Sequence, residues 1–311
     1  MSPATPVLAL GAACLALGAC RAGQGRVAPI EPAPALVAPS PTSDVSVVDP
    51  GAEPRAPLRY RIDPGQAESL VMDLAIRMNL AVGEKAPPAP NPTVRLGMTV
   101  RSGTGGQHLN LDGKITSVEV VEEPGIPAQL VSALRSDLDR LKGTAWKAVF
   151  TDRGHLDLLS LPAPKDANAQ LLTTLEWVRE GLRLLLPPLP EAPVGKNARW
   201  QTRRRSSVAT ARIDETVIYQ LAGNGQPQLQ VTLGMDAPEQ PLNPGTPPGT
   251  KVVLSSFEGG GKGQIELQLT GLVQPSTLRW AAAGKGTATP AGEPPAPFTL
   301  GLEAAVVVKK K

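Results

Sequence analysis

Alternating apolar and polar residues dominate the chain between residues 58 and 121. In the longest run, from Leu70 to Val82, every second residue is apolar. Side chains of a strand point alternately to the two faces of a sheet, so this run predicts a long strand with one apolar and one wet face. Strand patterns also appear at Leu58 to Ile62, Val94 to Val100 and His108 to Val121. The last run contains Asp112-Gly113 and predicts one strand or a pair.

The period becomes helical in two places. A stripe of apolar residues from Leu130 to Leu141 predicts a helix near 127 to 142 that stops at Gly143. A second stripe, from Leu171 to Leu185, predicts a helix near 167 to 186, capped by Asp166 or Asn168 and ended by Pro187-Pro188. Between them, residues 151 to 154 predict a hairpin turn with Gly154 at positive φ.

Strand patterns return after Trp200. Alternation predicts strands around 217 to 221, 229 to 235, 265 to 269 and 300 to 308, with loops at 236 to 250, 258 to 263 and 284 to 297. This order favours an α+β fold, with a large curved antiparallel sheet, or sheets, and two amphipathic helices packed on one face.

The N-terminal segment has a different character. Val7 to Cys20 is uncharged, apolar and rich in small residues, which is typical of a signal peptide, and it is too short to span a bilayer. Met1 to Pro6 lacks the usual Lys or Arg, and a buried N-terminal helix is the alternative. The following stretch is rich in Pro and Ala and predicts an extended tether or an inconsequential disordered tail.

Leu17-Gly18-Ala19-Cys20 resembles the bacterial lipobox. The resemblance implies a lipoprotein signal peptide over 1 to 19 and a lipidated Cys20 carrying palmitate-type acyl chains. Composition and periodicity predict a tether over 20 to 56 and a mainly β domain over 57 to 311. Cys14 is the alternative lipidation site, although Gly11 stands where the lipobox has Leu. Arg21 replaces the Asp that retains some lipoproteins in the inner membrane, which implies the outer membrane.

A second resemblance lies between the predicted helix and Trp200. Pro190 to Trp200 reads PEAPVGKNARW, similar to a signature of uncharacterised bacterial lipoproteins known as domain-of-unknown-function families. Together with the hairpin around Asp152-Arg153-Gly154, the similarity covers residues 57 to 235. It implies an envelope location and a shared fold but no activity. Asn197 and Ala198 depart from the usual Gly and Asp, although Asn tolerates a left-handed turn.

Composition narrows the chemistry. The 31 Lys and Arg nearly balance the 28 Asp and Glu, so no strong field favours nucleic acid as a partner. Both cysteines precede residue 21, which excludes a disulfide framework or Cys-based metal site in the domain, and two histidines alone make a zinc site improbable. No metal or cofactor is expected.

No catalytic motif stands out. His108 and His155 lie outside any nucleophile elbow or HExxH context, and Gly259 to Gly263 lacks the Walker spacing and predicts a hairpin loop. Arg203-Arg204-Arg205 is typical of a solvated strand face or a guarded sheet edge. The chain is therefore expected to be no enzyme. The rival hypothesis, an enzyme acting on an envelope polymer, requires a histidine, a carboxylate and a serine in one cleft.

Successive predicted strands each present an apolar face, and this large apolar surface is the feature that points to a function. Open curved sheets with a helical lid resemble, in architecture only, envelope carriers that hold the acyl chains of lipids. The possible ligand face comprises Met72, Leu74, Ile76, Met78, Leu96, Met98, Leu233 and Met235. We expect a membrane-anchored protein that binds a hydrophobic ligand or a protein partner. The alternative is a structural envelope protein whose helices fill this face as an ordinary core.

Overall fold

The computed structural model describes residues 44–82, 92–103, 108–208, 211–222, 227–242 and 250–311. The predicted signal peptide, Cys14 and Cys20 lie outside these residues. Within them the chain forms a large antiparallel sheet and two helices, which confirms the α+β class. Neither helix is long and apolar enough to cross a bilayer.

The main sheet has 13 strands in the order β1-β9-β10-β11-β13-β14-β15-β3-β4-β5-β6-β7, with β12 paired to β13. The strands in the first half of the chain are β1 (Asp44–Asp49), β2 (Ala52–Ala56), β3 (Ala67–Val82), β4 (Thr93–Ser102), β5 (His108–Val121), β6 (Ala145–Thr151) and β7 (Leu156–Ser160). Those in the second half are β8 (Val194–Lys196), β9 (Arg199–Val208), β10 (Ala211–Ala222), β11 (Gln228–Ala237), β12 (Gln240–Leu242), β13 (Lys251–Glu266), β14 (Ser276–Thr289) and β15 (Ala296–Lys310).

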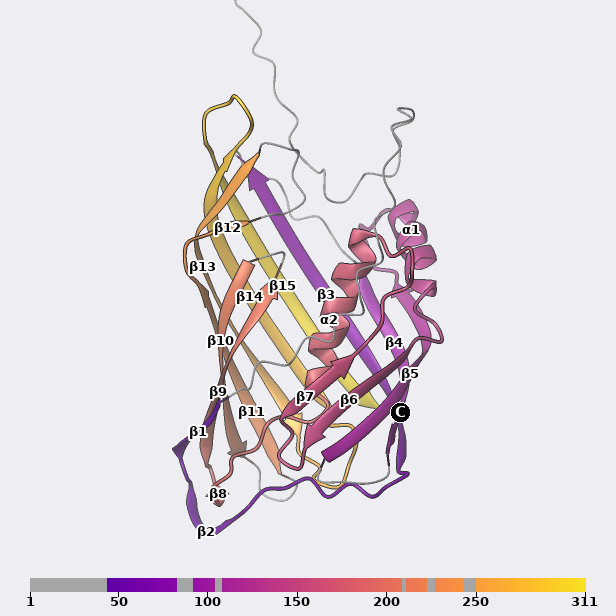
Figure 1. The fold of residues 1–311 in the computed structure, drawn as a ribbon, viewed down its shortest axis with the longest axis vertical. Helices are drawn as coiled ribbons and strands as arrows, with labels where there is room; N and C mark the ends of the chain where they lie inside the picture. Colours follow the sequence, from indigo (N-terminus) through magenta and orange to yellow (C-terminus); the bar gives the residue numbers. More distant parts are fainter. Residues whose placement is uncertain (1–43, 83–91, 104–107, 209–210, 223–226, 243–249) are drawn as a thin grey trace, which may run out of the picture.

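The C-terminal strand lies in the middle of the sheet. β15 pairs with β14 on one side and β3 on the other, so that Val306 faces Leu74 in the register. Figure 1 shows the sheet curving around α2, with β15 beside β3 at the back of the curve. Buried residues alternate along β15, β3 and β4, which places a continuous apolar layer on the inner face.

The two helices cover part of that inner layer. α1 (Ala128–Asp139) buries Val131, Leu134 and Leu138 and packs near β5. α2 (Ala169–Arg183) begins at Asn168, whose side chain accepts a hydrogen bond of 2.8 Å from the Leu171 amide. The predicted helices and the Asn168 alternative for the cap are therefore confirmed.

α2 approaches the sheet closely. A Cβ at Gly181 would lie 2.4 Å from Met72 Sδ, so only glycine fits there without displacing that side chain. On the same helix, the Trp177 ring lies 6.0 Å from the ring of Trp280 on β14, in a tilted arrangement. These contacts seat α2 across the curve, between β3 and β14.

The N-terminal strands correct two predictions. β1 pairs with β9 and β2 pairs with β8, so residues 44–56 belong to the folded unit rather than to the tether expected over 20 to 56. The expected strand at Leu58 to Ile62 is an irregular extended segment instead. Its alternation has a different cause: Tyr60 is buried because its hydroxyl donates to Pro187 O at 2.9 Å.

The Gly-rich loops were also mispredicted. β13 runs through Gly259 to Gly263, and β14 extends into the expected loop at 284 to 297 as far as Thr289, so that only residues 290 to 295 connect it to β15. Glycines serve packing here, because a Cβ at Gly261 would lie 2.4 Å from Arg279 O and 2.5 Å from Trp280 Cβ. In β5, Gly113 makes room for the Trp146 ring within one continuous strand, which settles the choice between one strand and two.

The turn before Trp200 forms as the sequence predicts. Asn197 adopts a φ of 63°, the left-handed conformation that Asn tolerates. Trp200 is fully buried and stacks on Tyr219, with ring centroids 5.9 Å apart. The Trp200 indole N–H donates to Pro188 O at 2.9 Å, which ties the start of β9 to the end of the second helical region.

A candidate ligand cavity under the second helix

A cavity of about 270 Å³ lies between the sheet, the C-terminal end of α2 and the β6–β7 hairpin. Its size is slightly below the range of small-molecule sites, which span about 300 to 1,000 Å³. The wall formed by β10, β11, β13 and β14 is apolar. Its apolar lining comprises Val217, Val231, Leu233, Ile265 and Leu278.

A partly buried ion cluster borders the cavity through Arg183 and Arg204. Arg204 on β9 contacts Glu215 on β10 at 2.6 Å (Nε to Oε2) and Glu180 on α2 at 2.9 Å (Nη2 to Oε2). Arg183 Nε lies 3.3 Å from Glu180 Oε1. The Glu215 side chain is only 7% exposed, and it also accepts a hydrogen bond from the Ser206 hydroxyl. The cluster joins the helix to the sheet.

Burial and the charges of the cluster shift the pKa values of Arg204 and Tyr219. Burial opposes the charge of Arg204, but the adjacent carboxylates Glu180 and Glu215 outweigh it and raise the pKa of the guanidinium. Burial also raises the pKa of Tyr219 to about 12, against the opposing effects of Arg204 and a hydrogen bond with Thr202. Arg204 therefore stays charged and Tyr219 stays neutral at physiological pH.

Two other polar groups of the lining have no hydrogen-bond partner among the described residues. Ser276 on β14 is 6% exposed, and its buried Oγ is unpaired. The buried Nε2 of His155, the residue before β7, is likewise unpaired. Unpaired buried polar atoms are costly, so both groups are available for a hydrogen bond with a ligand or water.

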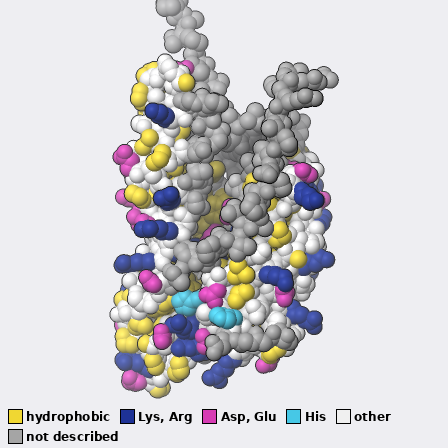
Figure 2. Space-filling model, viewed as in Figure 1, with side chains coloured by type: hydrophobic (Ala, Val, Ile, Leu, Met, Phe, Trp, Pro, Cys, Tyr) yellow, Lys and Arg dark blue, Asp and Glu magenta, His cyan; other side chains and the backbone are white. Residues whose placement is uncertain are grey.

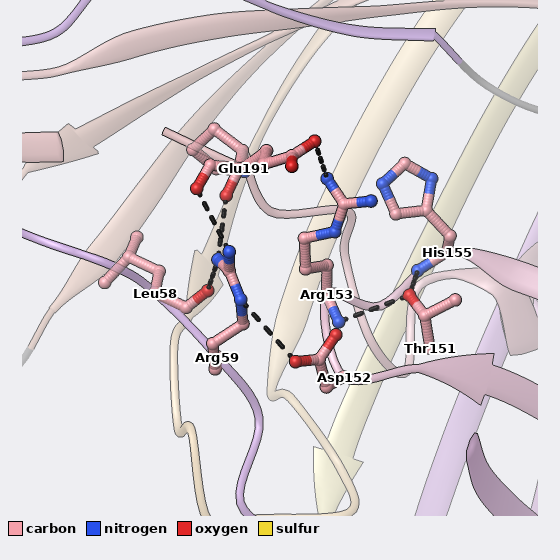
Figure 3. Close-up of polar contacts among 8 residues, drawn as sticks. Leu58, Arg59, Thr151, Asp152, Arg153, His155 and Glu191 are labelled. Atoms are coloured by element: carbon pink, nitrogen blue, oxygen red, sulfur yellow. Dashed lines mark hydrogen bonds and ion pairs between the residues drawn. The ribbon is translucent and has the colours of Figure 1, made fainter. Parts of the chain in front are cut away.

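Figure 3 shows how His155 is held. Thr151 Oγ1 accepts hydrogen bonds of 3.2 Å from the amides of Arg153 and His155, which fixes the hairpin turn. Burial, and then the neighbouring Arg153 charge, lowers the pKa of His155, against the opposing charges of Asp157 and Asp152. The imidazole is therefore neutral at physiological pH.

Arginine contacts anchor this hairpin to the rest of the fold. Arg59 donates to Pro190 O at 3.1 Å and Glu191 O at 3.0 Å, and its Nε lies 3.5 Å from Asp152 Oδ2. Arg153 donates to Glu191 Oε2 at 3.2 Å. Figure 2 shows histidine, acidic and basic side chains gathered at the surface of this face.

The predicted ligand face is mostly core. Leu233 is the one predicted residue among the described residues that line the cavity. Met235 is 6% exposed, Ile76 and Met78 are partly buried, and the remaining four are fully packed. Those four are Met72, Leu74, Leu96 and Met98. Met98 also lines a second hollow, of about 250 Å³, with Ser117 and Arg95.

The enzyme hypothesis requires a histidine, a carboxylate and a serine in one cleft, and the structure meets this requirement only in part. His155, Asp157 and Ser276 line the same cavity. However, Asp157 Oδ2 lies 3.2 Å from His108 Nδ1, and neither His155 Nε2 nor Ser276 Oγ has a hydrogen-bond partner among the described residues. A base without an orienting acid and a nucleophile without its base do not form a catalytic triad. In the described part of the chain, no group of three acidic, His or Cys residues could hold a metal.

The sequence pattern does not indicate the ion cluster, because Arg203, Arg204 and Arg205 form a run that is typical of a solvated strand face. The structure points Arg204 inward, whereas Arg205 is 81% exposed. The position of Glu215 in the sequence is the feature that could have indicated the ion cluster. This residue lies between Ile213 and Val217 in the buried phase of β10, where a carboxylate requires a partner.

Comparisons with known proteins do not add a family. No protein-family model matches the chain, and no curated protein matches its sequence. Among solved structures, in-vitro folded OmpT, an outer membrane protein of Vibrio cholerae in its trimer form, aligns with 79% of this chain and 100% of its own, at 9% identity and a TM-score of 0.20. Such a low TM-score carries no argument about fold or function.

Proposed function

We propose that this chain is a lipoprotein of the cell envelope, anchored in the outer membrane through Cys20, that binds a hydrophobic ligand in the cavity under α2. One observation carries the proposal: an apolar wall faces a few polar groups, and three of their atoms, Ser276 Oγ, His155 Nε2 and Arg183 Nε, have no hydrogen-bond partner among the described residues. This combination is typical of small-molecule sites.

Lipidation is tested by growing an expressing bacterium with an alkyne-labelled fatty acid and detecting label on the full-length chain. Cys20→Ser should abolish labelling, and Cys14→Ser should leave it intact. Label retained by Cys20→Ser and lost by Cys14→Ser would move the anchor to Cys14. An unlabelled wild-type chain would overturn the lipoprotein proposal.

Ligand binding is tested by native mass spectrometry of the full chain purified gently from membranes, with solvent extraction of any bound lipid. Titration with a neutral environment-sensitive fluorophore complements it. Leu278→Trp should fill the cavity and weaken probe binding at least about tenfold, which corresponds to about 1.4 kcal/mol. Arg279→Trp, one position along β14 and on its exposed face, is the matched control and should bind like wild type.

The alternative is a structural or protein-interaction role with no small ligand. It predicts that no lipid co-purifies and that the fluorophore gives the same weak signal with wild type and Leu278→Trp. Crosslinking in intact envelopes would then identify the protein partner.

Hydrolysis is the second candidate function, because His155, Asp157 and Ser276 line one cavity. It predicts turnover of a chromogenic acyl ester that both Ser276→Ala and His155→Gln abolish. Turnover that survives both substitutions, or no turnover by folded wild type, rejects it.

A further inference from the structure

The charge balance of the cavity constrains the head group of the ligand. Arg183 and Arg204 line the cavity, and their positive charges are matched by the carboxylates of Glu180 and Glu215. None of these four side chains is more than 30% exposed, so water screens them only partly. The two positive and two negative charges of the cluster therefore cancel without a ligand.

The other charged groups near the cavity are paired or open to water. Asp157, the remaining charged residue of the lining, is 42% exposed, so water solvates its carboxylate, and its Oδ2 lies 3.2 Å from His108 Nδ1. Arg153, beside His155, is bonded to Glu191 at 3.2 Å. His155 itself is neutral at physiological pH, because burial lowers its pKa. A carboxylate, phosphate or ammonium head would therefore bring an uncompensated charge into a partly buried site, which is costly.

Hydrogen-bonding capacity, in contrast, is free. Ser276 Oγ both donates and accepts, and the neutral imidazole of His155 offers Nε2 as one further donor or acceptor. Ser276 begins β14 and His155 immediately precedes β7, and both line the same cavity. They match a hydroxyl, ester or amide group.

We infer that the cavity takes an uncharged amphiphile, with a single apolar chain on the wall of β10, β11, β13 and β14 and a hydroxyl, ester or amide head at Ser276 and His155. The inference rests on the proposed function and names the chemical class of the ligand. A volume of about 270 Å³ suits one chain rather than a lipid with several.

The test is displacement of the neutral fluorophore from the full chain at neutral pH by three compounds of equal chain length: a monoacylglycerol, a fatty acid and a fatty amine. The monoacylglycerol should compete at a concentration at least about tenfold lower than either charged compound. Equal or tighter binding of the fatty acid or the amine would overturn the inference and leave the proposed function standing. Absence of fluorophore binding to folded wild type would overturn both.

Two substitutions sharpen the test. Ser276→Ala removes one hydrogen bond and should weaken monoacylglycerol binding roughly three- to tenfold, with little effect on the fluorophore. Glu180→Gln leaves the cluster with one excess positive charge, so the preference should shift toward the fatty acid by about tenfold. Glu176→Gln, on the exposed side of α2 and paired with Arg179, is the matched control and should keep the neutral preference. An unchanged preference in Glu180→Gln would contradict the charge-balance argument.

Discussion

Nη2 of Arg204 on β9 lies 2.9 Å from Oε2 of Glu180 on α2, so the second helix is fixed to the sheet by a charge pair as well as by apolar contacts. Arg204 also lines the proposed ligand cavity. Stability and the proposed ligand binding should therefore both depend on this side chain.

Arg204→Met should destabilise the fold by about 3 kcal/mol, because it leaves the 7% exposed carboxylate of Glu215 without its counter-ion. The double variant Arg204→Met, Glu215→Leu should lose less than the single variant. Urea unfolding of the full chain measures both. Arg205→Met, whose exposed side chain pairs with Asp214, should change stability by less than about 1 kcal/mol. A single variant as stable as Arg205→Met would show that the cluster is not structurally important.

His155 should make stability depend on pH. Its folded-state pKa is lowered by burial and by Arg153, whereas the unfolded imidazole has its ordinary pKa of about 6.5. The unfolded chain then binds the proton more tightly, so stability is fully present above about pH 6.5 and falls as the pH drops toward the folded pKa. His155→Gln should flatten the free energy of unfolding between about pH 5 and 7. His108→Gln keeps His155 and should retain the slope.

Close packing of β13 against β14 should make Gly261 intolerant of a methyl group. Gly261→Ala places Cβ 2.4 Å from Arg279 O and should cost about 1 to 3 kcal/mol, measured by urea unfolding. Gly234→Ala, in the neighbouring β11, meets nothing nearer than Thr216 O at 3.9 Å and should be neutral or stabilising by about 0.5 kcal/mol. Equal effects at the two positions would contradict this reading of the strand contact.

Asn168 should stabilise α2 in two ways. Its side-chain oxygen caps the helix at the Leu171 amide, and its Nδ2 donates to Asp137 Oδ2 at 2.8 Å, which links α2 to α1. Asn168→Ala should cost about 1 to 2 kcal/mol in thermal or urea unfolding. Asn168→Ser keeps a capping oxygen and should recover about half of that loss. Identical losses for Ala and Ser would assign the effect to the Asp137 contact alone.

Much of the fold follows from periodicity. The alternation from Leu70 to Val82 became β3, and the two helical stripes became α1 and α2. The Gly-rich segment from Gly259 to Gly263 predicts a loop, but it lies inside β13 and pairs with β14, where the glycines allow close packing. A local pattern cannot reveal a neighbour that arrives from elsewhere in the chain.

The candidate site was less predictable for the same reason. Its lining comes from the β6–β7 hairpin, the end of α2 and strands β9 to β14, and sequence spacing does not indicate that Ser276 and His155 share a cavity. Leu233 was found because apolar alternation marks the inner face, but that pattern does not separate cavity from core. The four packed residues Met72, Leu74, Leu96 and Met98 follow the same alternation as Leu233.

The central position of β15 has a consequence for how the chain folds. β3 and β14 lie on either side of β15, and Leu74 gains its register partner Val306 only when β15 pairs with β3. The part of the sheet from β1 to β14 and the part from β3 to β7 can thus form early, but they join into one sheet only when β15 pairs with both. Such long-range pairing slows folding and leaves two strand edges open meanwhile. Shortening the chain within β15 would divide the sheet at its middle, whereas trimming β1 would remove only an outer strand.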